Sequence, residues 1–186
     1  MVCKLRFVKE DGVELPAQIY LFQGLPKADK MELIIQKAIE LGAYEVIPVA
    51  AKRCVVKLDD KKAAAKVSRW QGIAEAAAKQ SKRGVIPDVH SVMSMREAIE
   101  YARNMDVKLI PYERAEDMER TKSAIEAVGS GEKIAVFIGP EGGFEESEIQ
   151  AALEAGIEPI TLGKRILRTE TAGLTVLAWL MYQLES

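Results

Sequence analysis

Apolar and polar residues recur with two different periods along this chain, and the change of period predicts helices and strands in turn. In residues 30–41 the apolar side chains, from Met31 to Leu41, return every three or four positions, which is the spacing of one face of a helix. Gly42 follows at once, and glycine is typical of a helix end. Shorter apolar runs, such as residues 133–138, predict buried strands instead.

The same two patterns cover most of the remaining chain. They predict strands at residues 2–8, 19–23, 44–49, 107–112, 133–138 and 159–162. They predict helices at residues 30–41, 60–82, 121–128, 145–155 and about 171–184, with a shorter helix before Asn104. Strands that alternate with helices indicate an α/β fold, with a mainly parallel sheet and helices on both faces. A chain of 186 residues has the size of one main domain.

Composition and charge exclude several classes of protein. The chain has no apolar run long enough for a membrane span and no signal peptide at its start, so we expect a cytoplasmic protein. Two cysteines without CxxC spacing and a single histidine argue against a disulfide framework and against a metal site. The net charge of -2 argues against binding nucleic acid through bulk positive charge, although local basic clusters remain available for RNA.

The loops after the last three predicted strands carry the candidate chemistry, because ligands of α/β sheets bind beyond the carboxyl ends of the strands. The middle loop reads Gly-Pro-Glu-Gly-Gly-Phe at residues 139–144, and glycines there allow backbone to approach a ligand closely. It matches neither GxGxxG nor GxxxxGK, and the acidic helix start that follows would repel a phosphate. A neutral or cationic ligand fits this loop better.

The last loop places Lys164, Arg165 and Arg168 directly before a polar segment, residues 169–171, that opens an apolar helix. An ordinary structural interpretation is available: a threonine caps the helix, Glu170 complements the helix dipole, and the basic residues are solvated. This interpretation explains the threonines, but not such dense polar chemistry immediately before a helix that is expected to be buried.

Several blocks of sequence resemble those of a known family. Residues 138–144, Ile-Gly-Pro-Glu-Gly-Gly-Phe, and residues 166–172, Ile-Leu-Arg-Thr-Glu-Thr-Ala, closely resemble the paired signatures of the bacterial 16S ribosomal RNA uridine-N3 methyltransferase family, in the SPOUT class. Upstream blocks in the same order are Leu25-Pro26-Lys27, Gln36-Lys37-Ala38, Glu40-Leu41-Gly42, Arg53, Glu75, Gln80-Ser81 and Arg83. Together they cover nearly everything from Gln18 onward.

The resemblance implies a fold and an assembly that the periodicity alone does not. The fold is a SPOUT-type α/β domain with a C-terminal deep trefoil knot, which ordinary rules of chain topology would disfavour. Members are homodimers with each active site near the subunit interface. They also carry an N-terminal PUA-like RNA-binding domain, so we expect residues 1–17 to be its remnant and residues 18–186 to be the methyltransferase domain.

The final helix gives a separate reason to expect a homodimer. It is apolar over more than one face, and the core of one domain covers only part of such a helix.

The resemblance also implies a cofactor and a substrate. The cofactor is S-adenosylmethionine, and the residues expected to bind it are Pro111, Tyr112, Glu113, Ile138, Gly139, Pro140, Glu141, Gly142, Gly143, Leu162, Gly163, Ile166 and Leu167. The substrate is N3 of a uridine in 16S ribosomal RNA of the small ribosomal subunit.

Roles for individual side chains follow from the same resemblance. We expect Arg168 to stabilise the uridine anion, and Glu170 to orient that anion or accept its proton. Arg53, Gln80, Arg83 and Arg165 are expected to bind RNA, so that Arg83→Ala should mainly weaken RNA binding.

Two other functions stay open at this point. A catalytically inactive RNA-binding protein of the SPOUT fold would keep these blocks without transferring a methyl group. A nucleotide-binding transferase of a kinase-like class would need a phosphate cradle, and the absence of a lysine after the glycines argues against it. Calorimetry with S-adenosylmethionine separates the first alternative from the enzyme.

Overall fold

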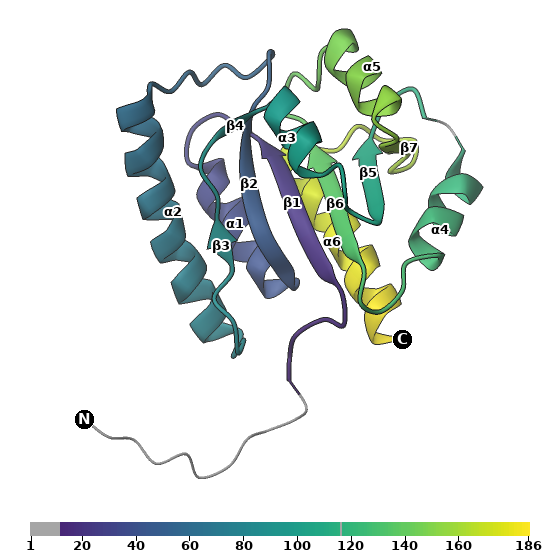
Figure 1. The fold of residues 1–186 in the computed structure, drawn as a ribbon, viewed down its shortest axis with the longest axis horizontal. Coiled ribbons are helices and arrows are strands. Elements are labelled where there is room, and N and C mark those ends of the chain that lie inside the picture. The colour runs from purple at the N-terminus through teal and green to yellow at the C-terminus, as the bar shows by residue number, and fades with distance from the viewer. Residues whose placement is uncertain (1–11, 116) are drawn as a thin grey trace.

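Strands and helices alternate along the part of the chain that the structure, a computed structural model, describes: residues 12–115 and 117–186 (Figure 1). The elements in chain order are β1 (Gln18–Gly24), α1 (Lys30–Glu40), β2 (Ala43–Ala50), α2 (Asp60–Gln80), β3 (Asp88–Val89), β4 (Met93–Ser94), α3 (Met95–Tyr101), β5 (Val107–Pro111), α4 (Met118–Glu126), β6 (Lys133–Ile138), α5 (Glu146–Glu154), β7 (Glu158–Ile160) and α6 (Thr169–Glu185). All strand pairs are parallel, in the order β3-β2-β1-β6-β5-β7, and β4 also pairs with β2. The predicted α/β class with a parallel sheet is confirmed.

Strand β1 shows how the two faces of the sheet are covered. Its residues from Ile19 to Gly24 are all buried, as expected for a strand with helices on both sides. Tyr20 and Phe22 contact the ring of Tyr101 in α3 on one face. Leu21, which points the other way, lies against α6, and Figure 1 shows α3 in front of the sheet and α6 behind it.

The element boundaries depend on caps that are visible in the sequence. Helix α2 begins after Asp59, whose side chain accepts a hydrogen bond from the backbone N–H of Lys62. It ends at Gln80, two residues earlier than expected, and Lys82 beyond it has a φ of 61°. Helix α4 begins three residues early because Asp117 caps it.

Other differences from the expected elements are small. Helix α6 starts at Thr169 instead of about residue 171, and β3 and β4, of two residues each, were not expected at all. The strand expected at residues 2–8 lies outside the described residues.

The C-terminal part of the chain returns from the edge of the sheet to its centre. Strand β7 is an edge strand beside β5, and residues 161–168 then lead back to α6, which contacts β1 and β6. The threading of this segment through a loop, which the resemblance implies, stays a prediction. Across residues 12–115 and 117–186, no helix is long and apolar enough to span a membrane.

Candidate functional site

A cavity of about 620 Å³ lies where the loops after β5, β6 and β7 come together. Its lining includes every residue that the resemblance assigned to the cofactor, namely residues 111–113, 138–143, 162–163 and 166–167. Arg53, Arg165 and Arg168 also line it, whereas Glu170 does not. The structure therefore gathers residues from three distant segments into one site at the carboxyl ends of the strands.

The turn at residues 139–143, here named the glycine-rich turn, is shaped by close backbone contacts. Gly143 has a φ of +66°, a conformation that side chains disfavour. A Cβ atom on Gly139 would lie 3.2 Å from the Cα atom of Gly143. On the other side, a Cβ atom on Gly24 at the end of β1 would lie only 2.6 Å from the nitrogen of Pro140. The turn thus lies in direct contact with the end of β1, and this contact leaves no room for a side chain at position 24. The sequence motifs had not revealed that Gly24 is required.

A buried chain of hydrogen bonds fixes the start of α6 against this turn. The hydroxyl of Thr169 donates to the carbonyl of Gly139 at 2.6 Å and accepts from the side-chain amide of Gln23 at 2.9 Å. Gln23 is fully buried, and its amide also donates to the carbonyl of Gly24. The helix that follows Arg168 is therefore positioned by contacts with both β1 and β6.

The loop after β2 supplies Arg53 to the edge of the cavity. The guanidinium of Arg53 donates to the carbonyl of Gly142 at 3.2 Å. Its neighbour Lys52 donates its backbone N–H to the buried carboxylate of Glu148 in α5 at 2.9 Å. These two bonds hold the loop against the glycine-rich turn and α5, so that Arg53 joins Arg165 and Arg168 among the exposed cations around the cavity.

Lys30, the first residue of α1, also lines the cavity and pairs with two carboxylates. Its ammonium lies 3.1 Å from Oε1 of Glu141 and 3.3 Å from Oε2 of Glu170. The hydrogen bond to Glu141 is the main reason why the pKa of Lys30 is raised. Burial alone would raise the pKa of Glu141, but backbone N–H groups, including that of Lys27, and the Lys30 ammonium lower it overall. Lys30 was not among the expected site residues.

Comparison with known proteins agrees with this geometry. The family described as RNA methyltransferase domain matches residues 13–181 of the chain. The chain belongs to this family. Ribosomal RNA small subunit methyltransferase E of Bacillus subtilis (strain 168) is 39% identical over 198 residues, which cover 98% of this chain and 77% of that protein.

Two solved structures resemble this RNA methyltransferase domain closely. One is a putative methyltransferase from Legionella pneumophila in complex with the bound cofactor SAM, with a TM-score of 0.84, 34% identity, and coverage of 94% of this chain and 69% of that one. The other is a Ribosomal RNA small subunit methyltransferase E from Neisseria gonorrhoeae bound to S-adenosyl methionine, with a TM-score of 0.81, 38% identity, and coverage of 91% and 68%. The expected family and SPOUT-type fold are thus confirmed.

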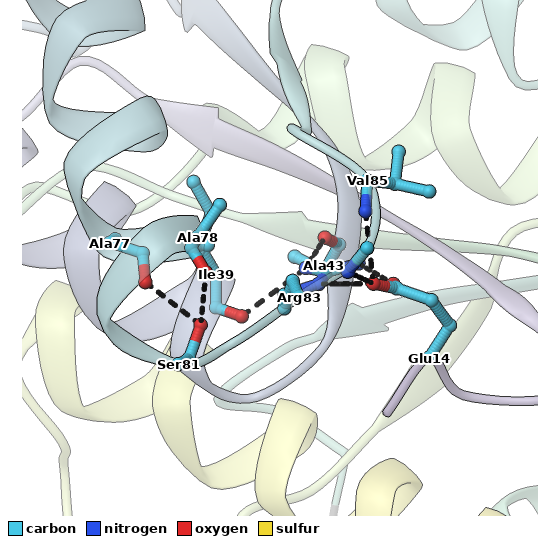
Figure 2. A network of polar contacts seen from close by, with 9 residues as sticks. Glu14, Ile39, Ala43, Ala77, Ala78, Ser81, Arg83 and Val85 are labelled. Atoms are coloured by element: carbon cyan, nitrogen blue, oxygen red, sulfur yellow. Dashed lines mark hydrogen bonds and ion pairs between the residues drawn. The ribbon is translucent and has the colours of Figure 1, made fainter. Parts of the chain in front are cut away.

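Arg83 of this RNA methyltransferase domain has a structural environment that differs from the expected one (Figure 2). Its guanidinium donates to the carboxylate of Glu14 and to the carbonyls of Ile39 and Ala43, and its side chain is only 4% exposed. A buried guanidinium with these partners is not free to meet a phosphate, which argues against the expected role of Arg83 in RNA binding and favours a structural role. Gln80 is exposed at the end of α2, and neither residue lines the cavity.

The remaining candidate residues are placed as follows. Glu170 contacts Lys30, and within the described part of the chain no hydrogen bond joins it to Arg168. Arg168 directly precedes α6 and is exposed at the cavity. Among residues 12–115 and 117–186, no group of three acidic, histidine or cysteine side chains has the arrangement of a metal site.

Proposed function

We propose that this chain transfers the methyl group of S-adenosylmethionine to N3 of a uridine in 16S ribosomal RNA. The observation that carries the proposal is the cavity itself, which brings the glycine-rich turn and the loops after β5 and β7 together beside Arg168. Relatives named as small-subunit ribosomal RNA methyltransferases, and similar structures whose titles state bound S-adenosylmethionine, support the choice of cofactor and RNA.

The lining of the cavity fits S-adenosylmethionine in size and in chemistry. Sites for small molecules are typically some hundreds of Å³ in volume and largely apolar, with a few polar groups, and a cavity of about 620 Å³ falls in that range. Ile138, Leu162 and Leu167 offer apolar surface for an adenine ring, while backbone groups of the turns can bond its edge. The carboxylate of Glu113 suits a ligand that carries positive charge, whereas that of Glu141 is already paired with Lys30.

Transfer to N3 of uridine requires the loss of a proton from the base, and this requirement gives Arg168 its role. When bound, S-adenosylmethionine would supply a methyl group attached to a positively charged sulfur, so that transfer leaves neutral S-adenosylhomocysteine while the N3 proton passes to solvent. The guanidinium of Arg168 lies at the same cavity and at the amino end of α6, so both its charge and the helix dipole favour an anionic base there. Glu170 contacts Lys30 and lies outside the lining, which favours an orienting role over proton acceptance.

RNA binding is assigned to the exposed basic side chains around the cavity, Arg53, Arg165 and Arg168, as part of the same proposal. The small ribosomal subunit is the proposed partner. Residues 1–17 are proposed to belong to an N-terminal RNA-binding domain, and residues 18–186 to be the catalytic domain.

A homodimer is the proposed assembly. Along α6, Leu174, Ala178 and Trp179 are only partly buried and Tyr182 is 75% exposed, so that much apolar surface of this helix stays uncovered in one chain. Light scattering at micromolar concentration should give twice the mass of the chain, and a monomer would contradict the assembly.

Calorimetry and single-turnover methylation test the proposed reaction. The wild-type chain should bind S-adenosylmethionine and methylate 16S ribosomal RNA, with the product identified by mass spectrometry. Arg168→Ala should lower the single-turnover rate at saturating RNA by about a hundredfold or more while sparing cofactor affinity. Arg96→Ala, at an exposed position of α3, is the matched control.

Two outcomes would contradict the proposal. A wild-type chain that binds no S-adenosylmethionine would favour the inactive RNA-binding alternative. An Arg168→Ala variant with an unchanged rate would remove Arg168 from the chemistry.

A further inference from the structure

Lys30 links three segments that are far apart in the sequence. It is the first residue of α1, Glu141 belongs to the glycine-rich turn, and Glu170 lies in the first turn of α6. Both carboxylates lie within 3.3 Å of the same ammonium nitrogen. One cation is thus shared between the turn that lines the cavity and the helix that follows Arg168.

The environment separates this contact from an ordinary surface ion pair, which usually contributes little. The side chains of Lys30, Glu141 and Glu170 are 28%, 26% and 18% exposed. Oε2 of Glu170 is shielded from solvent and has no hydrogen-bond partner among the described residues. Its negative charge is therefore balanced mainly by the Lys30 ammonium at 3.3 Å.

Removing the cation would leave two carboxylates facing the same space. Both carboxylates lie within 3.3 Å of the position that the ammonium would vacate, so their like charges would repel each other. The glycine-rich turn and the start of α6 would then move apart, or one carboxylate would take up a proton. Either change disturbs the spacing between the wall of the cavity and Arg168. The hydrogen bond from Thr169 to Gly139 also joins these two segments. It is uncharged, however, so it cannot balance the two carboxylates.

We propose that Lys30 is a positioning residue for methyl transfer, which holds the glycine-rich turn and the first turn of α6 in the arrangement that the reaction needs. The proposal rests on the function proposed above. Lys30 lines the cavity, but its ammonium is paired with Glu141 and Glu170, so the proposal assigns it no contact with the reacting atoms. Its effect is on the relative placement of the cavity wall and Arg168.

Substitutions at Lys30 distinguish charge from packing. Lys30→Met keeps an unbranched stem but removes the cation, and we expect about a tenfold loss of S-adenosylmethionine affinity and a larger loss in single-turnover rate. Lys30→Arg keeps the charge and should recover most of both. Lys37→Met, which removes the i,i+3 partner of Glu40 from the same helix, is the matched control and should change neither quantity.

A double-mutant cycle gives a readout that a merely structural role would not produce. If Lys30 acts by balancing Glu170, then Lys30→Met should cost less than about twofold in affinity when Glu170→Gln is already present, because no second charge remains to be repelled. Near-ultraviolet circular dichroism and thermal unfolding confirm that each variant is folded. If Lys30→Met does not fold, Lys30→Gln and the Glu170→Gln background carry the same comparison.

The outcomes separate this inference from the proposed function. Wild-type affinity and rate in folded Lys30→Met would overturn the inference while the reaction stands. Equal losses with and without Glu170→Gln would also overturn it. A wild-type chain without cofactor binding or methylation would overturn the proposed function itself.

Discussion

Replacing Arg83 with methionine should destabilise the whole domain, because this residue connects three parts of the chain from a buried position. Its guanidinium bonds the Glu14 carboxylate and the carbonyls of Ile39 and Ala43, which are left without these donors in the variant (Figure 2). Loss of one partner from a buried ion pair costs about 3–5 kcal/mol. Because the Glu14 side chain is 30% exposed and regains some hydration, we expect about 3 kcal/mol, the lower end of that range.

Urea unfolding, followed by the fluorescence of the two tryptophans, measures this change. Lys79→Met alters an exposed cation near the end of α2, the helix that precedes Arg83, and should change the free energy of unfolding by less than about 0.5 kcal/mol. If Arg83→Met were as stable as the wild type but bound RNA more weakly, the structural role of Arg83 would be refuted. The expectation that Arg83 binds RNA would then be supported.

The pH dependence of the same experiment has a definite sign. Partial burial would raise the pKa of Glu14, but hydrogen bonds from Arg83, Val85 and Gly84 and the charge of Arg83 together lower it. A carboxyl whose pKa is lower in the folded state stabilises the protein above its unfolded pKa, and this contribution is lost as the pH falls through the folded value. The difference between wild type and Arg83→Met should therefore be full at pH 7 and shrink below about pH 4.

Three further predictions concern the cavity, the sheet and the assembly. Gly142→Val should weaken S-adenosylmethionine binding about tenfold in calorimetry, because the side chain would stand where backbone approaches the ligand. The chain should stay folded, since a Cβ atom at this position would lie at an ordinary distance of 3.4 Å from the Cβ atom of Arg53. Unchanged affinity would contradict this prediction. Burial raises the pKa of Glu45, so Glu45→Gln should stabilise the domain by up to about 1 kcal/mol at pH 7.5 in urea unfolding, and the gain should vanish near pH 3, where Glu45 is neutral. Tyr182→Glu should shift light scattering from dimer to monomer with helicity retained; a dimer of unchanged stability would place the interface elsewhere.

Local patterns in the sequence predicted most elements and the place of the cavity. Apolar runs such as residues 133–138 form strands because their side chains are buried on both faces of the sheet. Asp59 caps α2 because its side chain accepts a hydrogen bond from the first turn of that helix. The glycine-rich turn was also recognisable, since its glycines are adjacent in the sequence. Each of these signals lies within a few residues of the feature that it determines.

Arg83 and Lys30 could not be interpreted in this way. Glu14, the partner of Arg83, lies 69 positions away, and Glu141 and Glu170 lie still farther from Lys30. No local pattern distinguishes a buried, paired cation from a solvated one. The order of the strands was equally hidden, because it depends on contacts between segments that the fold brings together only in three dimensions.

The order of the strands also determines when this protein can fold during synthesis. Strand β1 is made before its neighbour β6, which is translated only after β2, β3, β4 and β5. Until then one long edge of β1 has no partner, and pairing between such distant segments is slow and open to aggregation. Most of the loops around the cavity come from residues 111–168, so a ribosome must finish most of this chain before the chain has a site with which to modify ribosomal RNA.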